Sequence, residues 1–283
     1  MRNSNQVFEL LTKIVTADER IRVMTLEGSR VNPNVKQDPW QDYDITFLVT
    51  DVESYLTSDK WLEKFGERIF VQKPEGMSLY PPDFPNGWFS YLMLFPDGIK
   101  IDLTLVPIAD SQLYFEQDPL IQILIDKDGQ FQTPLEPTDE MFWVQAPSAQ
   151  LVEDCANEFY FVSTYVKKGL LRKELLYANG LLEQILRPEL LRMLGYLVGA
   201  RVGFPINLNK QMKRLPQLLS ADETQRLYQT YRLESLEQTQ IVLNEMMVFF
   251  EEVLQEVCQL MDYPAPNFYE TIKLYHQTLE TVV

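Results

Sequence analysis

The sequence predicts an α+β protein, in which a mixed α/β first half is followed by an all-helical second half. Before about residue 135, short runs of β-branched and aromatic residues alternate with turn signals. After Pro147, apolar residues recur almost only at helical spacing. Apolar residues make up 46% of the 283 positions and aromatic residues 12%, which is enough for a substantial core.

The first half combines a helix, strands and a long loop. Helical positions are indicated by the spacing of its apolar residues, and strands by runs of β-branched and aromatic residues. Pro96-Asp97-Gly98 is typical of a hairpin turn. The predicted elements are a helix at 6–15, strands at 21–26 and 44–49, a Pro- and Gly-rich loop at 74–87, and a hairpin formed by 91–95 and 99–106.

The second half is predicted to be helical throughout. Ser148 is typical of a helix N-cap, and the helix that it starts reaches Lys168, where Gly169 is expected to end or weaken it. Pro188, Pro205 and Pro264 are expected to break later helices. The later helices are predicted at 173–186, 189–198, 221–228, 236–260 and 268–279.

A proline-rich segment separates the two halves. Pro134–Pro147 holds three prolines and is the best candidate for a linker. We therefore expect one domain at residues 1–135, a linker at 136–147 and a second domain at 148–283.

The net charge of −16 limits the classes of binding partner that we expect. A surface this acidic repels nucleic acids and anionic membranes, and we expect neither as a partner. It attracts cations, such as Mg²⁺ or a small polycationic substrate, although acidic charge also serves solubility alone.

Cysteine and histidine usage excludes other classes of site. Cys155 and Cys258 lack metal-ligand spacing and are interpreted as reduced cysteines. The single histidine, His276, argues against a histidine-based triad or a zinc site, so acid–base chemistry falls to carboxylates, lysines or tyrosines. The sequence has no run of about 18 apolar residues and no signal-peptide core, so we expect a cytoplasmic protein with no membrane span.

Three carboxylates and a Gly-Ser turn form the pattern that indicates chemistry. Gly28 and Ser29 follow the first predicted strand. Asp42 and Asp44 alternate at the start of the second strand and therefore point the same way. A third carboxylate, Asp102, lies in another strand, which brings all three together if the two strands pair.

Such a cluster calls for a cation. Clustered carboxylates repel one another, and a hard divalent ion relieves that repulsion. Ligands that are all oxygen suit Mg²⁺, and two such ions can activate a hydroxyl and hold a triphosphate. Gly28 lets the backbone approach a phosphate, to which Ser29 and Arg30 can donate. We therefore predict a Mg-nucleotide site.

These motifs resemble the nucleotidyltransferase superfamily, and within it the aminoglycoside 6-adenylyltransferases, or streptomycin adenylyltransferases. The superfamily pattern is a Gly-Ser turn, an Asp-x-Asp strand and a third Asp. The closer likeness lies in Gly28-Ser29-Arg30-x-Asn32-Pro33, Gln41-Asp42-Tyr43-Asp44-Ile45 and Lys100-Ile101-Asp102-Leu103-Thr104. It continues in residues 79–82, 88–95, 126–129, 154–159, 164–170 and 189–193, and in Lys210 and Lys213.

The resemblance implies a fold and a reaction. The first domain would be a nucleotidyltransferase fold, a mixed sheet with flanking helices, and the second a helical bundle that binds the substrate. AMP would pass from MgATP to a hydroxyl of an aminoglycoside, at the 6-position of streptomycin, and would confer antibiotic resistance. The cationic acceptor then accounts for the acidic charge. We expect a monomer or a weak dimer.

Several residues keep alternative roles. Asp102 completes the metal site or takes the acceptor proton. Asp154 and Glu158 share a helix face and supply the base, bind the cationic substrate, or only solvate the helix. Lys210 and Lys213 reach the ATP phosphates or form an exposed basic turn. Trp88 and Tyr80 stack on a ligand guanidinium or pack in the core.

The sequence leaves two alternatives to aminoglycoside adenylyl transfer. One is a nucleotidyltransferase of the same fold that modifies another small molecule or a protein hydroxyl. The other is a nucleotide-binding protein without activity, against which the three clustered aspartates weigh.

Overall fold

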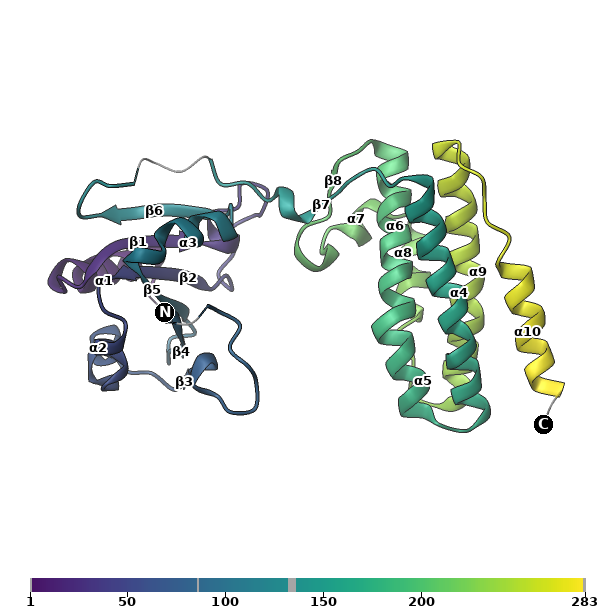
Figure 1. The fold of residues 1–283 in the computed structure, drawn as a ribbon, viewed down its shortest axis with the longest axis horizontal. Coiled ribbons are helices and arrows are strands. Elements are labelled where there is room, and N and C mark those ends of the chain that lie inside the picture. The colour runs from purple at the N-terminus through teal and green to yellow at the C-terminus, as the bar shows by residue number, and fades with distance from the viewer. Residues whose placement is uncertain (1, 86, 132–135, 282–283) are drawn as a thin grey trace. The chain divides into compact units, whose positions relative to one another are not determined.

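The chain folds into two compact units, Met1–Asp139 and Glu140–Val283 (Figure 1). The computed structural model describes residues 2–85, 87–131 and 136–281. Pro134 and the domain boundary predicted at 135 lie outside the described residues. Within the predicted linker 136–147, Trp143–Val144 form a strand (β7) that pairs with Ile206–Asn207 (β8), so this part belongs to the second unit.

A mixed six-stranded sheet forms the centre of the first unit. Its central strands β2 and β5 are parallel, whereas every other pair is antiparallel. The order is β3 (Phe70–Gln72), β4 (Phe89–Leu94), β5 (Lys100–Pro107), β2 (Tyr43–Val49), β1 (Ile21–Glu27) and β6 (Ile121–Asp126).

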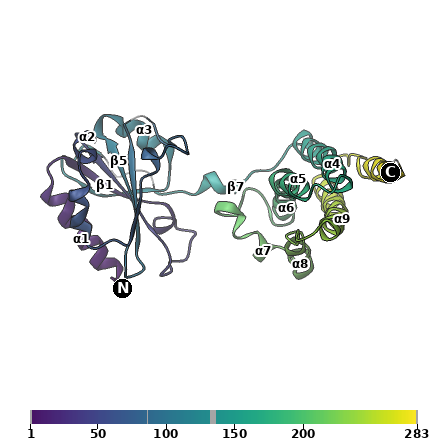
Figure 2. The ribbon, with the colours of Figure 1, turned by 90° about the horizontal axis from the view of Figure 1, so that it is seen from below.

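Helices cover both faces of this sheet. Alternation along β2 sends Phe47 to one face and Leu48 to the other. Phe47 packs in the cluster that also contains Leu11 of α1 (Ser4–Ala17) and Tyr55 of α2 (Glu53–Leu56). Leu48 packs with Tyr114 of α3 (Ser111–Gln117), so α1 and α3 lie on different faces (Figure 2).

The second unit is a helical bundle with one continuous core. Phe159 and Phe250 stack with ring centroids 3.8 Å apart, which joins α4 to α9. Ser148 caps α4 by accepting a hydrogen bond from the Leu151 N–H, as predicted. The helices are α4 (Ala149–Leu171), α5 (Leu175–Leu181), α6 (Arg187–Val202), α7 (Leu215–Leu218), α8 (Ala221–Gln229), α9 (Leu236–Met261) and α10 (Tyr269–Thr281).

Two predicted helix breaks are wrong. Gly169 does not end α4, which continues to Leu171. A Cβ at Gly169 would lie 2.9 Å from Tyr177 Cδ1, so this glycine allows α4 and α5 to approach closely. Pro188 does not break the chain either, because a π-helical turn at Leu182–Leu186 leads directly into α6 and Pro188 takes one of its first positions.

The fold class is confirmed as α+β, but four of the helices and strands of the first unit were not predicted. They are β3, β6, α2 and α3, and each is short. Among the residues that the structure describes, no helix combines the length and the apolar character needed to cross a bilayer.

Candidate active site

The predicted aspartates gather at one end of the central strands. Because β2 and β5 are parallel and in register, Asp44 lies directly opposite Asp102. On the other side of β2, the last residue of β1, Glu27, lies opposite Asp44. The Gly28-Ser29 turn follows at once, and Asp42 lies one residue before β2 begins.

Gly28 fits against the Asp44 carboxylate. Its φ of 68° lies in the left-handed region, and a Cβ at this position would lie 2.6 Å from Asp44 Oδ2. In this structure its N–H donates to the Leu120 carbonyl at 3.1 Å and is not free to bind a phosphate. The Ser29 hydroxyl has no hydrogen-bond partner among the described residues and keeps its capacity to donate.

Lys100 bridges two of the aspartates, a role that the sequence analysis missed. Its Nζ lies 2.7 Å from Asp42 Oδ2 and 2.7 Å from Asp102 Oδ2. In β5, Lys100 and Asp102 are two residues apart and share a face, which brings the ammonium beside both acids. Alternation in the predicted strand was the signal that was available for this pair.

The donor set of this cluster suits a hard divalent cation. Every carboxylate supplies oxygen only, and Asp102 Oδ1 is buried with no hydrogen-bond partner within the described residues. The side chains are not gathered round a common point, however. In residues 2–85, 87–131 and 136–281, no three His, Cys, Asp or Glu side chains form a group able to hold one ion. Lys100 instead lies between Asp42 and Asp102.

Burial and mutual repulsion perturb the acids. Burial, and then the charges of Asp102, Glu27 and Asp42, raise the pKa of Asp44 to about 6. Burial also raises the pKa of Asp102, although Lys100 acts in the opposite direction. Burial of the carboxylates away from water is the largest cause of both raised pKa values. A cation bound in the cluster would stabilise the charged carboxylates and lower these pKa values.

Glu27 is a fourth acid of the cluster that the sequence analysis did not single out. Burial raises its pKa, and its carboxylate accepts hydrogen bonds from the Tyr114 hydroxyl and the Thr25 hydroxyl. Tyr114 comes from α3, so this contact ties α3 to the end of β1. The position of Glu27 directly before Gly28 was its only signal in the sequence.

Arg30 holds the loop that carries Asp42. Its Nε donates to the Asp42 carbonyl and its Nη2 to the Gln41 carbonyl, each at 2.7 Å. The guanidinium carbon also lies 3.6 Å from the centre of the Tyr43 ring. Two donors that were predicted for a phosphate are therefore committed to the backbone, so Arg30 positions Asp42 in this structure.

Trp88 is a core residue. Its side chain is 4% exposed, its ring packs beside Tyr114, and its indole N–H donates to Asp110 Oδ2 at 2.9 Å. The stacking role predicted for Trp88 is therefore corrected, because a buried ring offers no face to a ligand. Tyr80 is 60% exposed and remains accessible.

The remaining predicted residues are exposed and lie in the second unit. Asp154 and Glu158 lie on the outer face of α4, and Asp154 Oδ1 accepts a hydrogen bond from the Gln150 side chain at 2.9 Å. Lys210 and Lys213 lie in a tight loop at residues 209–213. Three residues of this loop have left-handed φ values: Asn209 at 62°, Gln211 at 57° and Met212 at 54°.

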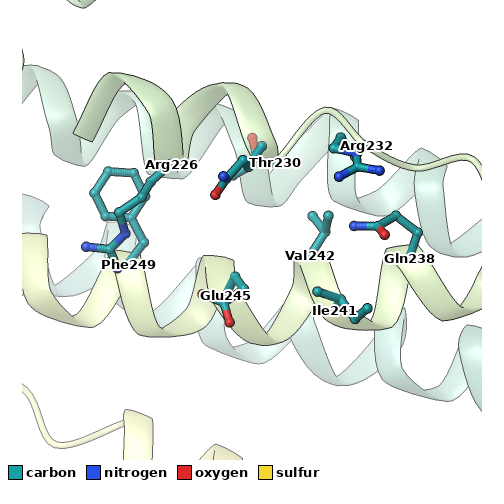
Figure 3. Close-up of a pocket in the computed structure, with 9 residues that line it drawn as sticks. Arg226, Thr230, Arg232, Gln238, Ile241, Val242, Glu245 and Phe249 are labelled. Carbon is teal, nitrogen blue, oxygen red and sulfur yellow. The ribbon is translucent and has the colours of Figure 1, made fainter. Parts of the chain in front are cut away.

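The helical unit also holds a cavity of about 260 Å³ between α8 and α9 (Figure 3). Arg226 lies over the Phe249 ring at 4.3 Å on one side of it, and Glu245 lines it from α9. None of the predicted site residues lines this cavity.

Fold and site together define a nucleotidyltransferase. A Gly-Ser turn follows β1 of a mixed sheet, and the next two strands of that sheet, β2 and β5, position the aspartates. A family profile described as streptomycin adenylyltransferase matches residues 1–279. The chain belongs to the streptomycin adenylyltransferase family.

Relatives match the chain over nearly its whole length. An aminoglycoside 6-adenylyltransferase from Campylobacter jejuni is 43% identical, over 97% of this chain and 95% of its own. Another from Bacillus subtilis is 41% identical, over 97% of both, and one from Staphylococcus aureus is 38% identical, over 96% and 97%. A crystal structure of an aminoglycoside 6-adenyltransferase from Bacillus subtilis is 37% identical and covers 99% of both chains, with a TM-score of 0.49. The sequence relatives carry the family assignment.

Proposed function

We propose that this protein transfers AMP from MgATP to a hydroxyl of an aminoglycoside, at the 6-position of streptomycin, and releases pyrophosphate. The observation that carries the proposal is the register of β2 and β5, which sets Asp44 opposite Asp102 beside the Gly28 turn. Relatives named for this reaction are 38% to 43% identical to the chain, which supports the same acceptor class.

Asp42, Asp44 and Asp102 would hold Mg²⁺, with two ions in the working site. Bound ions would neutralise charge on the phosphates and polarise the α-phosphate. The Ser29 hydroxyl, which lacks a partner among the described residues, would donate to a phosphate oxygen. Arg30 would keep Asp42 in place through the backbone carbonyls that it holds.

The transfer exchanges one bond at phosphorus for another. The acceptor oxygen attacks the α-phosphorus, the bond from that phosphorus to pyrophosphate breaks, and the hydroxyl proton passes to a carboxylate. A carboxylate that binds a cation is a weak base, since the cation lowers its pKa. The base would therefore lie outside the metal shell, and Asp154 and Glu158 are our candidates.

Electrostatics favour a cationic acceptor over an anionic one. The chain carries a net charge of −16, and the exposed carboxylates of α4 offer oxygen pairs to guanidinium groups. Lys210 and Lys213, which make no ion pair among the described residues, would supply positive charge for the triphosphate. We place the reaction in the cytoplasm, where ATP is available.

The acceptor is tested with purified protein, MgATP and a panel of aminoglycosides. We expect pyrophosphate release with streptomycin and a product heavier by one AMP, with NMR placing the AMP on the 6-hydroxyl. Turnover with another acceptor but none with streptomycin would overturn the assignment. Thermal stabilisation by MgATP without turnover on any acceptor would instead indicate a nucleotide-binding protein.

The roles of the two α4 carboxylates are tested separately. Glu158→Gln and Asp154→Asn are compared with Glu153→Gln, a control at another exposed position of the same helix. Loss of the base would lower kcat by about 10²- to 10⁴-fold, whereas loss of a binding contact would raise the KM for streptomycin. Unchanged kinetics in both variants would exclude both residues.

A further inference from the structure

Lys100 is the cation of the aspartate cluster. Its ammonium lies 2.7 Å from an oxygen of Asp42 and 2.7 Å from an oxygen of Asp102. The charge of Lys100 also acts on Asp44. It lowers the pKa of Asp44, whereas the charges of Asp102, Glu27 and Asp42 raise it. The register of β2 and β5 brings the acids together. When no metal ion is bound, Lys100 provides the positive charge that opposes them.

The bridge is built so that it can be released. The Lys100 side chain is 34% exposed, so its flexible four-carbon stem has access to solvent. An ammonium is a point charge without a required coordination geometry, so it can leave the carboxylates without breaking a fixed arrangement. Of the two carboxylate oxygens of Asp102, Lys100 bonds only Oδ2, whereas Oδ1 stays buried without a partner among the described residues.

The unsatisfied oxygen separates this arrangement from an ordinary ion pair. A buried carboxylate oxygen without a partner is costly, and native structures rarely leave one unless a ligand satisfies it. Lys100 thus neutralises the cluster only in part. A divalent ion that reached Asp102 Oδ1 would satisfy it and would compete for the oxygens that Lys100 now holds.

We propose that Lys100 is a built-in counter-ion that holds Asp42 and Asp102 in the metal-free protein, and that it is displaced when a divalent ion enters. Lys100 is then a positioning residue that sets the affinity for the metal. The inference rests on the metal site of the proposed function. It adds that metal binding is a competition, in which the ion must replace the ammonium that bridges Asp42 and Asp102.

The first test measures Mn²⁺ binding by calorimetry at pH 8 without nucleotide. Lys100→Met removes the competitor, and we expect it to bind Mn²⁺ on the order of tenfold more tightly than the native chain. Lys100→Arg keeps a cation and should stay near the native affinity. Lys73→Met is the matched control, because Lys73 is 35% exposed and pairs with Asp59 in the same unit.

The second test measures thermal unfolding with EDTA and with Mg²⁺. Without metal, Lys100→Met should melt below the native chain, since the acids lose their counter-ion, and saturating Mg²⁺ should close the gap. Lys73→Met should show no such metal-dependent recovery. A Lys100→Met chain that melted like the native chain in EDTA would overturn the proposal.

The outcomes separate this inference from the proposed function. Native binding of Mn²⁺ with no gain in Lys100→Met would overturn the counter-ion role and leave the metal site standing. No binding by any variant, with or without α,β-methylene-ATP, would overturn the metal site and the Lys100 role together.

Discussion

At the residue scale, two constraints act on Gly28. Its backbone is left-handed, and the space where a Cβ would stand is taken by the Asp44 carboxylate. Gly129 has a similar φ of 62° but nothing within 4 Å of its Cβ position, which makes it a matched control.

We expect Gly129→Ala to cost about 1 kcal/mol, the penalty for a left-handed alanine. Gly28→Ala should cost more than that and should also abolish adenylyl transfer, because Asp44 must move. Urea unfolding and pyrophosphate release check both variants. If Gly28→Ala and Gly129→Ala lost the same stability and kept the same activity, the close approach of Gly28 to Asp44 would affect neither quantity.

Asp44 makes the stability of the metal-free protein depend on pH. With its pKa raised to about 6, the folded chain holds this proton more tightly than the unfolded chain does. The contribution of Asp44 to stability is therefore present below the unfolded pKa near 4 and is lost as the pH rises through about 6.

Asp44→Asn removes this dependence. In EDTA, its free energy of unfolding should match the native value near pH 4 and exceed it by about 1–2 kcal/mol at pH 7. The full pKa shift corresponds to about 3 kcal/mol, which partial exposure reduces. Urea titrations at several pH values measure the difference, and a gap that did not widen with pH would refute the origin of the shift.

Some site residues were predictable and others were not. Asp42, Asp44 and Asp102 are visible because three signals occur in order along the chain: a Gly-Ser turn after a strand, two alternating acids at the next strand, and a later strand with a third acid. The bridge by Lys100 depends on the register of β5 against β2, and the use of the Gly28 N–H by Leu120 depends on the packing of a distant loop. The spacing of residues along the sequence predicts neither of these two contacts.

At the element scale, helices with clear boundaries were predicted well. The Ser148 cap and the apolar periodicity of α9 placed their helices within a few residues. Strand β6 was missed because its pairing with β1 is long-range and its run is short. The break predicted at Pro188 was wrong because this proline lies in the first turn of α6, where no intrahelical N–H is needed. A π-helical turn directly precedes α6, so the chain stays helical through this point.

The stacked pair between α4 and α9 is expected to stabilise the bundle. Phe250→Ala should cost about 3–5 kcal/mol, because it removes a fully buried ring and leaves a cavity. Phe161→Ala, on the outer face of α4 and 56% exposed, should change stability by less than about 0.5 kcal/mol. Chemical denaturation compares them, and a mild effect of Phe250→Ala would contradict the packing described here.

At the scale of the whole molecule, the net charge of −16 should govern capture of the acceptor. Raising the salt concentration from about 0.02 M to 0.5 M should raise the KM for streptomycin about fivefold and leave kcat nearly unchanged. The KM for MgATP, an anion that the net charge repels, should rise less than the KM for streptomycin. Steady-state kinetics over this range test the point, and a streptomycin KM that is insensitive to salt would argue against charge attraction.

The central claim is that Asp42, Asp44 and Asp102 make a site that transfers AMP to an aminoglycoside. The most direct measurement follows label from α-³²P-ATP into streptomycin for the native chain and for Asp44→Asn, with circular dichroism to verify the fold. We predict labelled streptomycin and stoichiometric pyrophosphate from the native chain, and a rate at least about 10³-fold lower from the variant. Full activity in Asp44→Asn, or no labelled aminoglycoside from the native chain, would contradict the claim.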